Sequence, residues 1–296
     1  MDRDALVRKI IDSFPRLPAQ LGVAARYIVD NPDDVALLSM REQARRAGVQ
    51  PWTMSRLAKR FGYDGYEAIR ALHANAIRQG ELGFAGRAGR QAARQKESGE
   101  TALARDIVAA GATQIGRLGA PDSLAALADA AALLAAARHV YCLGLRSSHA
   151  IAAQFAYIMS FLGDRAVLLG TDGFGGLDAV RMAGADDALL AVSVAPYSRA
   201  TLDIAHWAAG ENVPVVAITD SPVSPLAAIA RHTILVSTES PSFFHSMAPA
   251  FVAAETLAAL VAGHGGTETL AAIARAEQQL AAFGVHHLAP APRTRP

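Results

Sequence analysis

The apolar positions of this 296-residue chain change their spacing near residue 138. Before that point, apolar residues recur every three or four positions, which is the period of a helix that buries one face. Beyond it, short continuous apolar runs alternate with helical stretches, a pattern typical of a parallel sheet covered by helices on both faces. We therefore expect an all-helical front part followed by an α/β rear part.

The front part has clear helix boundaries. Apolar stripes, such as the one that begins with Leu6 and Ile10, predict its first helices, and Asn31-Pro32-Asp33 separates two of them. Ser39 stands three residues before Glu42, which is the arrangement of a capping box. Gly48 can adopt the left-handed backbone of a tight turn, and a proline at position 51 can begin the next helix. Residues 39–69 therefore predict a helix, a tight turn, a second helix and then a third.

The rear part predicts five strands. The apolar runs cover residues 140–143, 166–169, 188–194, 213–219 and 233–236. Helical stretches are expected near 148–162, 175–184, 198–210, 225–230 and 246–262, after two alanine-rich helices at 101–117 and 122–137. In such sheets ligands bind beyond the carboxyl ends of the strands.

Composition and charge divide the chain in the same way. Residues 79–100 are rich in glycine and charge with few apolar anchors, which predicts a linker between a 1–78 domain and a 101–283 domain; residues 284–296 are expected to be a disordered tail. Residues 1–90 hold 15 Lys and Arg against 10 Asp and Glu, whereas residues 111–296 hold 10 against 14. The basic front part is therefore expected to meet a polyanion.

Other features of the composition narrow the class of protein. Cys142 is the only cysteine, which excludes a disulfide framework and fits a reducing, cytoplasmic location. The N-terminal segment carries acidic residues and has no long apolar core, so it does not resemble a signal peptide, and no charge-free run of 18 apolar residues predicts a membrane span. The histidines lack metal-ligand spacing, so neither a metal site nor a cofactor is expected.

The second helix of the pair is the candidate surface for reading DNA. Between Arg41 and Arg60 there are six basic residues and one acidic residue, and Met54, Leu57, Ala58 and Phe61 share one face that should pack inward. Arginine can bond a guanine edge with two donors, and glutamine or serine can contact bases or phosphate. The residues left for the open face are Gln50, Trp52, Thr53, Ser55, Arg56, Lys59 and Arg60. A solvated basic helix of an all-α domain is the alternative, in which Trp52 only packs against its neighbours.

These residues resemble a known family. The runs Tyr27-Ile-Val-Asp-Asn-Pro-Asp-Asp-Val, Ser39-Met-Arg-Glu-Gln-Ala, Ala47-Gly-Val, Arg56-Leu and Phe61-Gly-Tyr-Asp-Gly-Tyr are similar to the helix-turn-helix domain of RpiR-type bacterial transcriptional regulators. The runs Gly144-Leu-Arg-Ser-Ser, Val216-Ala-Ile-Thr-Asp and Ser224-Pro-Leu-Ala, with the strand end at Ser193, resemble their sugar isomerase (SIS) domain. The resemblance implies an α + α/β fold: an all-α helix-turn-helix domain and a three-layer αβα SIS domain with a five-stranded parallel sheet.

The resemblance also implies a site for an anionic effector. The family's Ser-x-Ser-Gly-x-Thr loop cradles a sugar phosphate, but this chain has Ser193, Ala195, Pro196 and Ser198 there, and proline has no N–H to donate. An anionic ligand remains the expectation, while its being a phosphosugar stays open. The candidate effector residues are Arg146, Ser147, Ser148, Ser193, Tyr197, Ser198, Arg199 and Glu255. The alternative is that the serines only cap helices.

The family further implies a function. We expect a DNA-binding transcriptional regulator, a repressor of carbohydrate or small-metabolite catabolism genes, that binds a double-stranded operator as a homodimer or homotetramer, away from membranes. The alternative is a phosphosugar isomerase or lyase with an accessory helical domain. Such an enzyme needs a base and an acid, and Glu255 and His245 lie in the region that would supply them. The altered loop and the basic helix favour the regulator, so no catalytic residue is expected.

Overall fold

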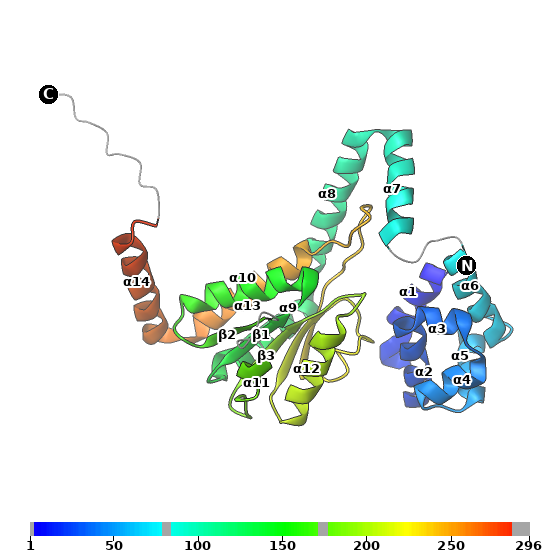
Figure 1. Cartoon of the computed structure of the whole chain (residues 1–296), viewed down its shortest axis with the longest axis horizontal. Coiled ribbons are helices and arrows are strands. Elements are labelled where there is room, and N and C mark those ends of the chain that lie inside the picture. Colours follow the sequence, from blue (N-terminus) through cyan, green and yellow to red (C-terminus); the bar gives the residue numbers. More distant parts are fainter. Residues whose placement is uncertain (1–2, 79–83, 171–176, 286–296) are drawn as a thin grey trace.

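The computed structural model describes residues 3–78, 84–170 and 177–285. Figure 1 shows an N-terminal helical bundle and an α/β part, with a helical hairpin and a last helix that both project from the α/β part. The predicted change from helical to α/β structure is therefore confirmed.

The bundle contains six α-helices around one apolar core. They are α1 (Arg3–Ser13), α2 (Ala19–Asp30), α3 (Pro32–Leu37), α4 (Met40–Ala47), α5 (Pro51–Arg60) and α6 (Tyr66–Arg78), with a short 3-10 turn η1 (Phe14–Arg16) after α1. Gln43 ties three of them together, because its amide donates to the carbonyls of Val35 and Leu38 and its oxygen accepts from the Tyr66 hydroxyl. These bonds satisfy a polar side chain that is fully buried.

The connection between α4 and α5 follows the prediction closely. The Ser39 hydroxyl accepts the Glu42 N–H at 3.3 Å, Gly48 takes a left-handed φ of 69°, and Pro51 begins α5. Only half of the predicted capping box forms, since the Glu42 carboxylate bonds Arg45 and Arg46 instead of the start of the helix. The turn geometry thus follows from residue types that each favour the backbone conformation found at their position.

Residues predicted as a linker include a helix. Helix α7 (Phe84–Ser98) pairs with α8 (Glu100–Arg117) in the projecting hairpin (Figure 1), and Arg94 bonds Asp106 across it at 2.6 Å. The alanines, arginines and glutamines of this segment are good helix formers, and they outweigh the glycines that suggested a flexible chain. Helix α9 (Pro121–Ala136) follows.

The five predicted strands form one parallel sheet. Their bounds are β1 (Val140–Gly144), β2 (Ala166–Leu169), β3 (Ala188–Val192), β4 (Val215–Thr219) and β5 (His232–Leu235), in the order β2-β1-β3-β4-β5. Register places Leu143 beside Leu169 and Ala191, so the carboxyl ends of the central strands meet at one edge. The helix predicted at 225–230 is wrong: these residues form turns, in which the Ser224 hydroxyl accepts the Ala227 N–H.

Helices cover both faces of the sheet. Side chains such as Val140 and Leu190 pack with α9, α10 (His149–Ser160) and α13 (Ala248–His264) on one face. Alternate side chains such as Tyr141 and Leu189 pack on the other face with α11 (Leu177–Val180) and α12 (Arg199–Gly210). The three-layer αβα architecture is therefore confirmed, and with it the α + α/β class.

The last helix, α14 (Gly266–Ala282), leaves the three layers and projects away from α13 (Figure 1). Within the described residues no single helix has both the length and the hydropathy of a membrane span, although two pairs of helices with a sharp bend pass that test together. Most of the tail predicted at 284–296 lies outside the described residues.

Candidate functional site

The basic side chains of helices α4 and α5 differ in whether they form ion pairs. Arg46 bonds Asp34 at 2.9 Å, and Arg45 and Arg46 both bond Glu42. These bonds lower the pKa of Glu42 to about 2. The arginines at the end of α4 are thus committed to bonds within the bundle.

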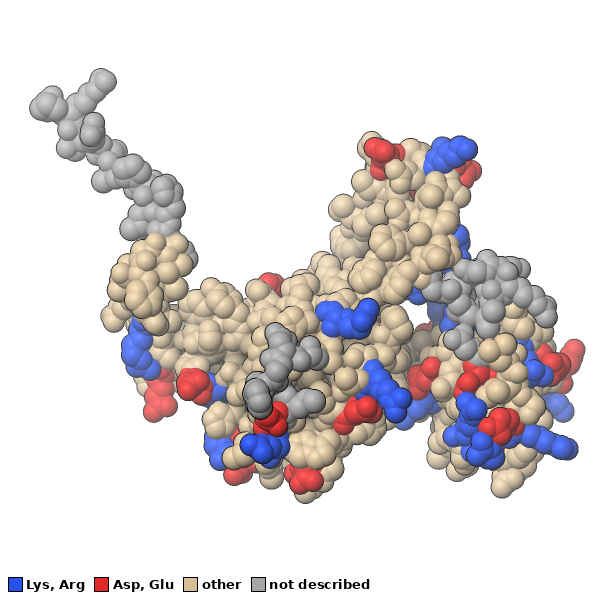
Figure 2. All heavy atoms as spheres, viewed as in Figure 1, with Lys and Arg blue, Asp and Glu red and all other residues tan. Residues whose placement is uncertain are grey.

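The cations of α5 are arranged differently. Arg56, Lys59 and Arg60 are exposed, and none of them forms an ion pair with any described residue. The Arg56 guanidinium lies over the Trp52 ring, 5.2 Å from its centroid, and Trp52 is 55% exposed. Figure 2 shows that charged side chains gather on this bundle. The outward face of α5 is therefore cationic and available to a polyanion.

The structure corrects part of the predicted DNA surface. Thr53 was expected on the open face, but it is only 2% exposed because it lies one helical turn before buried Leu57. Ser55 is half-buried, and its hydroxyl donates to the Met40 sulfur at 3.5 Å. Gln50, like Trp52, is exposed at the start of α5, whose inward residues are Met54, Leu57, Ala58 and Phe61 as predicted.

A second candidate site lies at the carboxyl edge of the sheet. It is a pocket of about 460 Å³ between the segment that follows β1 and the loop that follows β3. Its lining residues come from four segments of the chain: Phe84; Leu145, Arg146, Ser147 and Ser148; Ser193, Val194, Pro196 and Ser198; Phe244 and His245. Five of the predicted effector residues are thus brought together: Arg146, Ser147, Ser148, Ser193 and Ser198.

The segment after β1 approaches the strand closely. A Cβ atom on Gly144 would collide with the backbone of Ser148, so this position requires glycine. Arg146 adopts φ of 56°, a left-handed backbone that is rare outside glycine, in the 3-10 turn η2 (Arg146–Ser148). This unusual backbone places two consecutive serines at the mouth of the pocket, where strained residues often serve a ligand.

The hydroxyls of the pocket are held by a few hydrogen bonds. Ser147 Oγ lies 2.9 Å from His245 Nε2, and the Ser193 hydroxyl accepts the Ser198 N–H at 3.4 Å. Ser198 caps α12 by accepting the Thr201 N–H, so the capping role considered for the serines holds for this one. Within the described residues, Asp and Glu are absent from the lining, which leaves hydroxyls, one guanidinium and one imidazole. This set of donors suits an anionic group.

His245 is the main polar residue that the effector prediction omitted. It is 8% exposed, its Nδ1 has no partner among the described residues, and burial is the largest cause that lowers its pKa. A neutral imidazole presents one donor and one acceptor to a ligand. In the sequence, His245 was indicated only by its position near Glu255, as part of the isomerase alternative.

Three predicted effector residues do not line the pocket. Tyr197 is hydrogen-bonded to Asp220, and the Asp220 carboxylate also accepts the Ala195 N–H at 3.1 Å. These two bonds hold the loop that follows β3. Arg199 is 94% exposed and pairs with Asp203, because the first turn of α12 directs it to solvent. Glu255 is exposed on α13, whose buried positions are all apolar.

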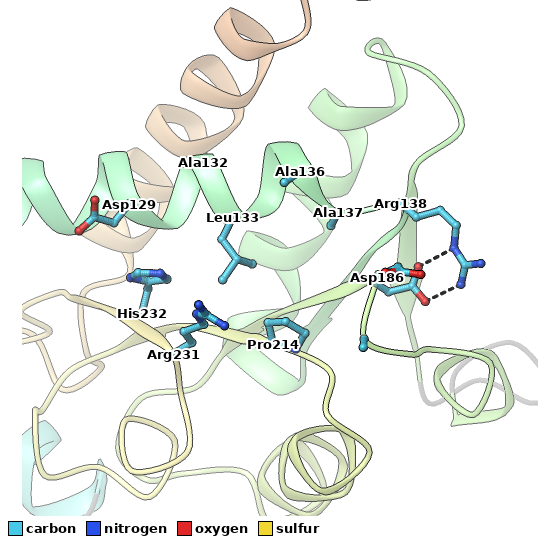
Figure 3. A pocket seen from close by; sticks show the side chains of 12 residues that line it. Asp129, Ala132, Leu133, Ala136, Ala137, Arg138, Asp186, Pro214, Arg231 and His232 are labelled. Carbon is cyan, nitrogen blue, oxygen red and sulfur yellow. Dashed lines mark hydrogen bonds and ion pairs between the residues drawn. The ribbon is translucent and has the colours of Figure 1, made fainter.

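The amino edge of the sheet carries a larger hollow, of about 770 Å³ (Figure 3). Asp187 is fully buried beside it and accepts from Arg138, at 2.8 and 3.0 Å, and from the N–H groups of His139 and Gly184. The Arg138 bonds are the main cause that lowers the pKa of Asp187 to about 2. No three His, Cys, Asp or Glu side chains in the described part of the chain cluster closely enough to hold a metal ion.

Comparison with known proteins identifies the rear part. Residues 133–262 match the SIS domain family, so this chain contains an SIS domain. The structure is similar to the sugar isomerase domain of the RpiR transcription factor from Sphaerobacter thermophilus, at 26% identity and a TM-score of 0.54, over 60% of this chain and 98% of that one. The Vibrio vulnificus NanR protein, solved in complex with ManNAc-6P, has a TM-score of 0.56 at 19% identity over 94% of this chain and 98% of that chain, which shows a shared fold. None of the curated proteins matches the chain.

Proposed function

We propose that this protein is a DNA-binding transcriptional regulator whose SIS domain senses a phosphosugar-like anion. The observation that carries the proposal is the exposed face of α5, where Arg56, Lys59 and Arg60 have no ion pair with any described residue. An uncompensated cationic helix behind a tight turn suits the major groove and its flanking phosphates. The expected reading residues are Gln50, Trp52, Arg56, Lys59 and Arg60.

The pocket at the carboxyl edge of the sheet supports the sensing part. Its serines and Arg146 are donors without a carboxylate among them, which favours an anionic ligand. The likeness to the RpiR transcription factor and to NanR, which was solved with a sugar phosphate, supports the class of ligand. We propose that binding releases the operator, so that the protein represses genes of carbohydrate or small-metabolite catabolism.

We further propose that the regulator acts as a homodimer or homotetramer, because one short helix makes too few contacts for a specific site. The surface over α10, between α8 and the projecting α14, carries few charges (Figure 2). Exposed Tyr157 of α10, Leu260 of α13 and Leu270 of α14 add apolar area on these helices. Such a surface suits contact with a second copy.

The isomerase alternative has less support. Moving a proton beside a carbonyl needs a base within reach of the substrate, and Glu255 lies exposed on α13 and does not line the pocket. His245 is present there, but its hydrogen bond is to the Ser147 hydroxyl. We therefore propose that the domain binds its ligand without converting it.

The test is the retention of duplex DNA by the full-length protein as salt rises. We expect affinity for a duplex selected from a random pool to fall steeply between about 50 and 200 mM salt, because phosphate contacts release counterions. Arg56→Ala should weaken this binding by about 1–3 kcal/mol, and Lys59→Ala should reduce the salt slope by about 1. Arg117→Ala removes the same charge from an exposed position on α8 and is the matched control. Binding that is absent at 50 mM salt, or equal for Arg56→Ala and wild type, would contradict the proposal.

A further inference from the structure

Helix α7 forms part of the wall of the effector pocket. The Phe84 ring stacks on Phe244, with centroids 5.1 Å apart and an interplanar angle of 14°, and it lies 6.1 Å from the His245 ring. One end of α7 is thus in contact with the segment that supplies His245 to the site. Gln91 makes a second contact with this segment, because its side-chain oxygen accepts the Phe243 N–H at 2.8 Å.

Arg87 lies between these two contacts on the same face of α7. It follows Phe84 by three residues and precedes Gln91 by four, and both spacings place side chains one above the other on a helix. Arg87 is exposed and forms no ion pair with any described residue. Its charge also helps to lower the pKa of His245, as expected of a cation near that ring. Arg87 does not itself line the pocket, but the face of α7 that contacts Phe243 and Phe244 carries its uncommitted guanidinium next to Phe84, which does.

The loop after β3 lacks a comparable group. Pro196 has no N–H, Tyr197 is held by Asp220, and Arg199 extends into solvent beside Asp203. The hydroxyls of Ser193 and Ser198 both accept backbone N–H groups. An anion in this pocket thus finds hydroxyls and Arg146 on the sheet side, and the described lining offers no cation on the opposite side unless α7 supplies one.

We propose that α7 completes the effector site, with Arg87 pairing with the anionic group of the ligand and Phe84 covering its apolar part. This inference rests on the proposed function, since it assigns a further residue to the same pocket. A guanidinium can bond two oxygens of a phosphate or carboxylate at once, which adds direction to the charge. Among the described residues α7 is the next helix after α6 of the bundle, so a ligand bound by Arg87 contacts the part of the chain that follows the proposed DNA-binding helices in sequence.

The experiment measures ligand binding to the full-length protein by calorimetry. The probes are inorganic phosphate, glucose 6-phosphate and N-acetylmannosamine 6-phosphate, each sugar also without its phosphate. Arg87→Gln should weaken binding of the phosphorylated probe by about tenfold or more, and Arg87→Lys should recover part of the loss. Lys96→Gln is the matched control, because Lys96 is an exposed cation two and a half helical turns further on, on the opposite side of α7.

The possible results separate the inference from the proposed function. Equal affinity of Arg87→Gln and wild type would overturn the role of Arg87 and leave the sensing function intact. An equal loss in Lys96→Gln would show only a general effect of charge on the hairpin, and would also overturn it. Two results would overturn phosphosugar sensing and the inference with it. In one, the wild type binds the unphosphorylated sugars as tightly as the phosphorylated ones; in the other, it binds none of the probes. Unchanged thermal unfolding of Arg87→Gln checks that α7 still packs.

Discussion

The two edges of the SIS sheet differ in how far their polar groups are already committed. At the amino edge the hollow is larger, about 770 Å³, but its buried carboxylate accepts from Arg138, His139 and Gly184. At the carboxyl edge the pocket is about 460 Å³, and the Nδ1 atom of buried His245 has no partner among the described residues. The buried carboxylate at the larger hollow therefore has its partners, whereas the smaller pocket contains a buried ring nitrogen without a partner among the described residues.

Backbone geometry separates the edges in the same direction. At the carboxyl edge, Arg146 has a left-handed backbone conformation and Gly144 lies close to the backbone of Ser148. The amino edge has a glycine in open space, Gly184, whose N–H serves the buried aspartate. The unusual backbone and the buried ring nitrogen without a described partner therefore favour the smaller pocket as the proposed ligand site, although its volume is the lesser.

The carboxylates of the two edges are perturbed in opposite directions. Asp187 has a lowered pKa, about 2, because Arg138 bonds it. Asp220, at the end of β4, has a raised pKa because burial outweighs its hydrogen bonds. Asp30 of α2 lies near Asp220, and burial raises its pKa to about 7. The ionised Asp187 at the amino edge thus stabilises the fold. Near the carboxyl edge, ionisation of Asp220 and Asp30 destabilises it.

The largest effect is expected from Asp187→Ala. The change removes the acceptor of two backbone N–H groups and of Arg138, so we expect a loss of about 2–3 kcal/mol in the free energy of unfolding at pH 7. The native pKa lies below the unfolded value, so this stabilisation is present above about pH 4 and is lost as pH falls toward 2. Urea unfolding at pH 7 and pH 3 measures both.

Asp186→Ala, which removes an exposed neighbour, is the control for Asp187→Ala. Ligand binding should survive in the folded Asp187→Ala protein, because the two edges do not share residues. A variant that stays folded but no longer binds would end the distinction between a structural edge and a binding edge.

A pair of glycine substitutions tests the edges against each other. Gly144→Ala forces the Ser148 backbone to move, so we expect a loss of about 1–3 kcal/mol in stability and weaker ligand binding. A Cβ on Gly184 meets no atom of the described residues within 4 Å, and Gly184 has no left-handed φ, so the stability of Gly184→Ala should be unchanged or slightly raised. Thermal unfolding and calorimetry distinguish the two, and equal behaviour would show that the close approach at Gly144 has no special role.

The fold was largely predictable because its signals are local. Strands that are buried on both faces read as continuous apolar runs, and Ser39, Gly48 and Pro51 each have a strong preference for the position they occupy. Helix α7 was missed because its glycines suggest flexibility, while its position depends on contacts with α8 and with Phe243 and Phe244.

The candidate site was predictable only in part. The resemblance to the SIS domain, together with the rule that ligands bind at strand ends, indicated Ser147, Ser148 and Ser193, but neither predicts side-chain direction. Arg199 is adjacent to the pocket in sequence and points to solvent because Ser198, not Arg199, occupies the cap of α12. Phe84 and Phe244 come from segments far apart in the chain, and no local pattern indicates that they meet.

The smallest effect is expected from Asp30→Asn, which tests the charge near the carboxyl edge. One carboxylate oxygen of Asp30 is buried and has no hydrogen-bond partner in the described part of the chain, and the charges that act on it are Arg26 and Asp220. Because the native pKa, about 7, exceeds the unfolded value of 3.8, the wild type loses stability as pH rises from about 4 to 7. Asparagine imitates the neutral acid, so Asp30→Asn should raise the thermal midpoint by about 3 °C at pH 8 and leave it unchanged near pH 3, where the carboxyl is neutral in both states. Asp12→Asn on the exposed face of α1 controls for net charge. A midpoint difference that stays constant with pH would mean that Asp30 keeps an ordinary pKa, and the contrast in charge between the two edges would then rest on Asp187 and Asp220 alone.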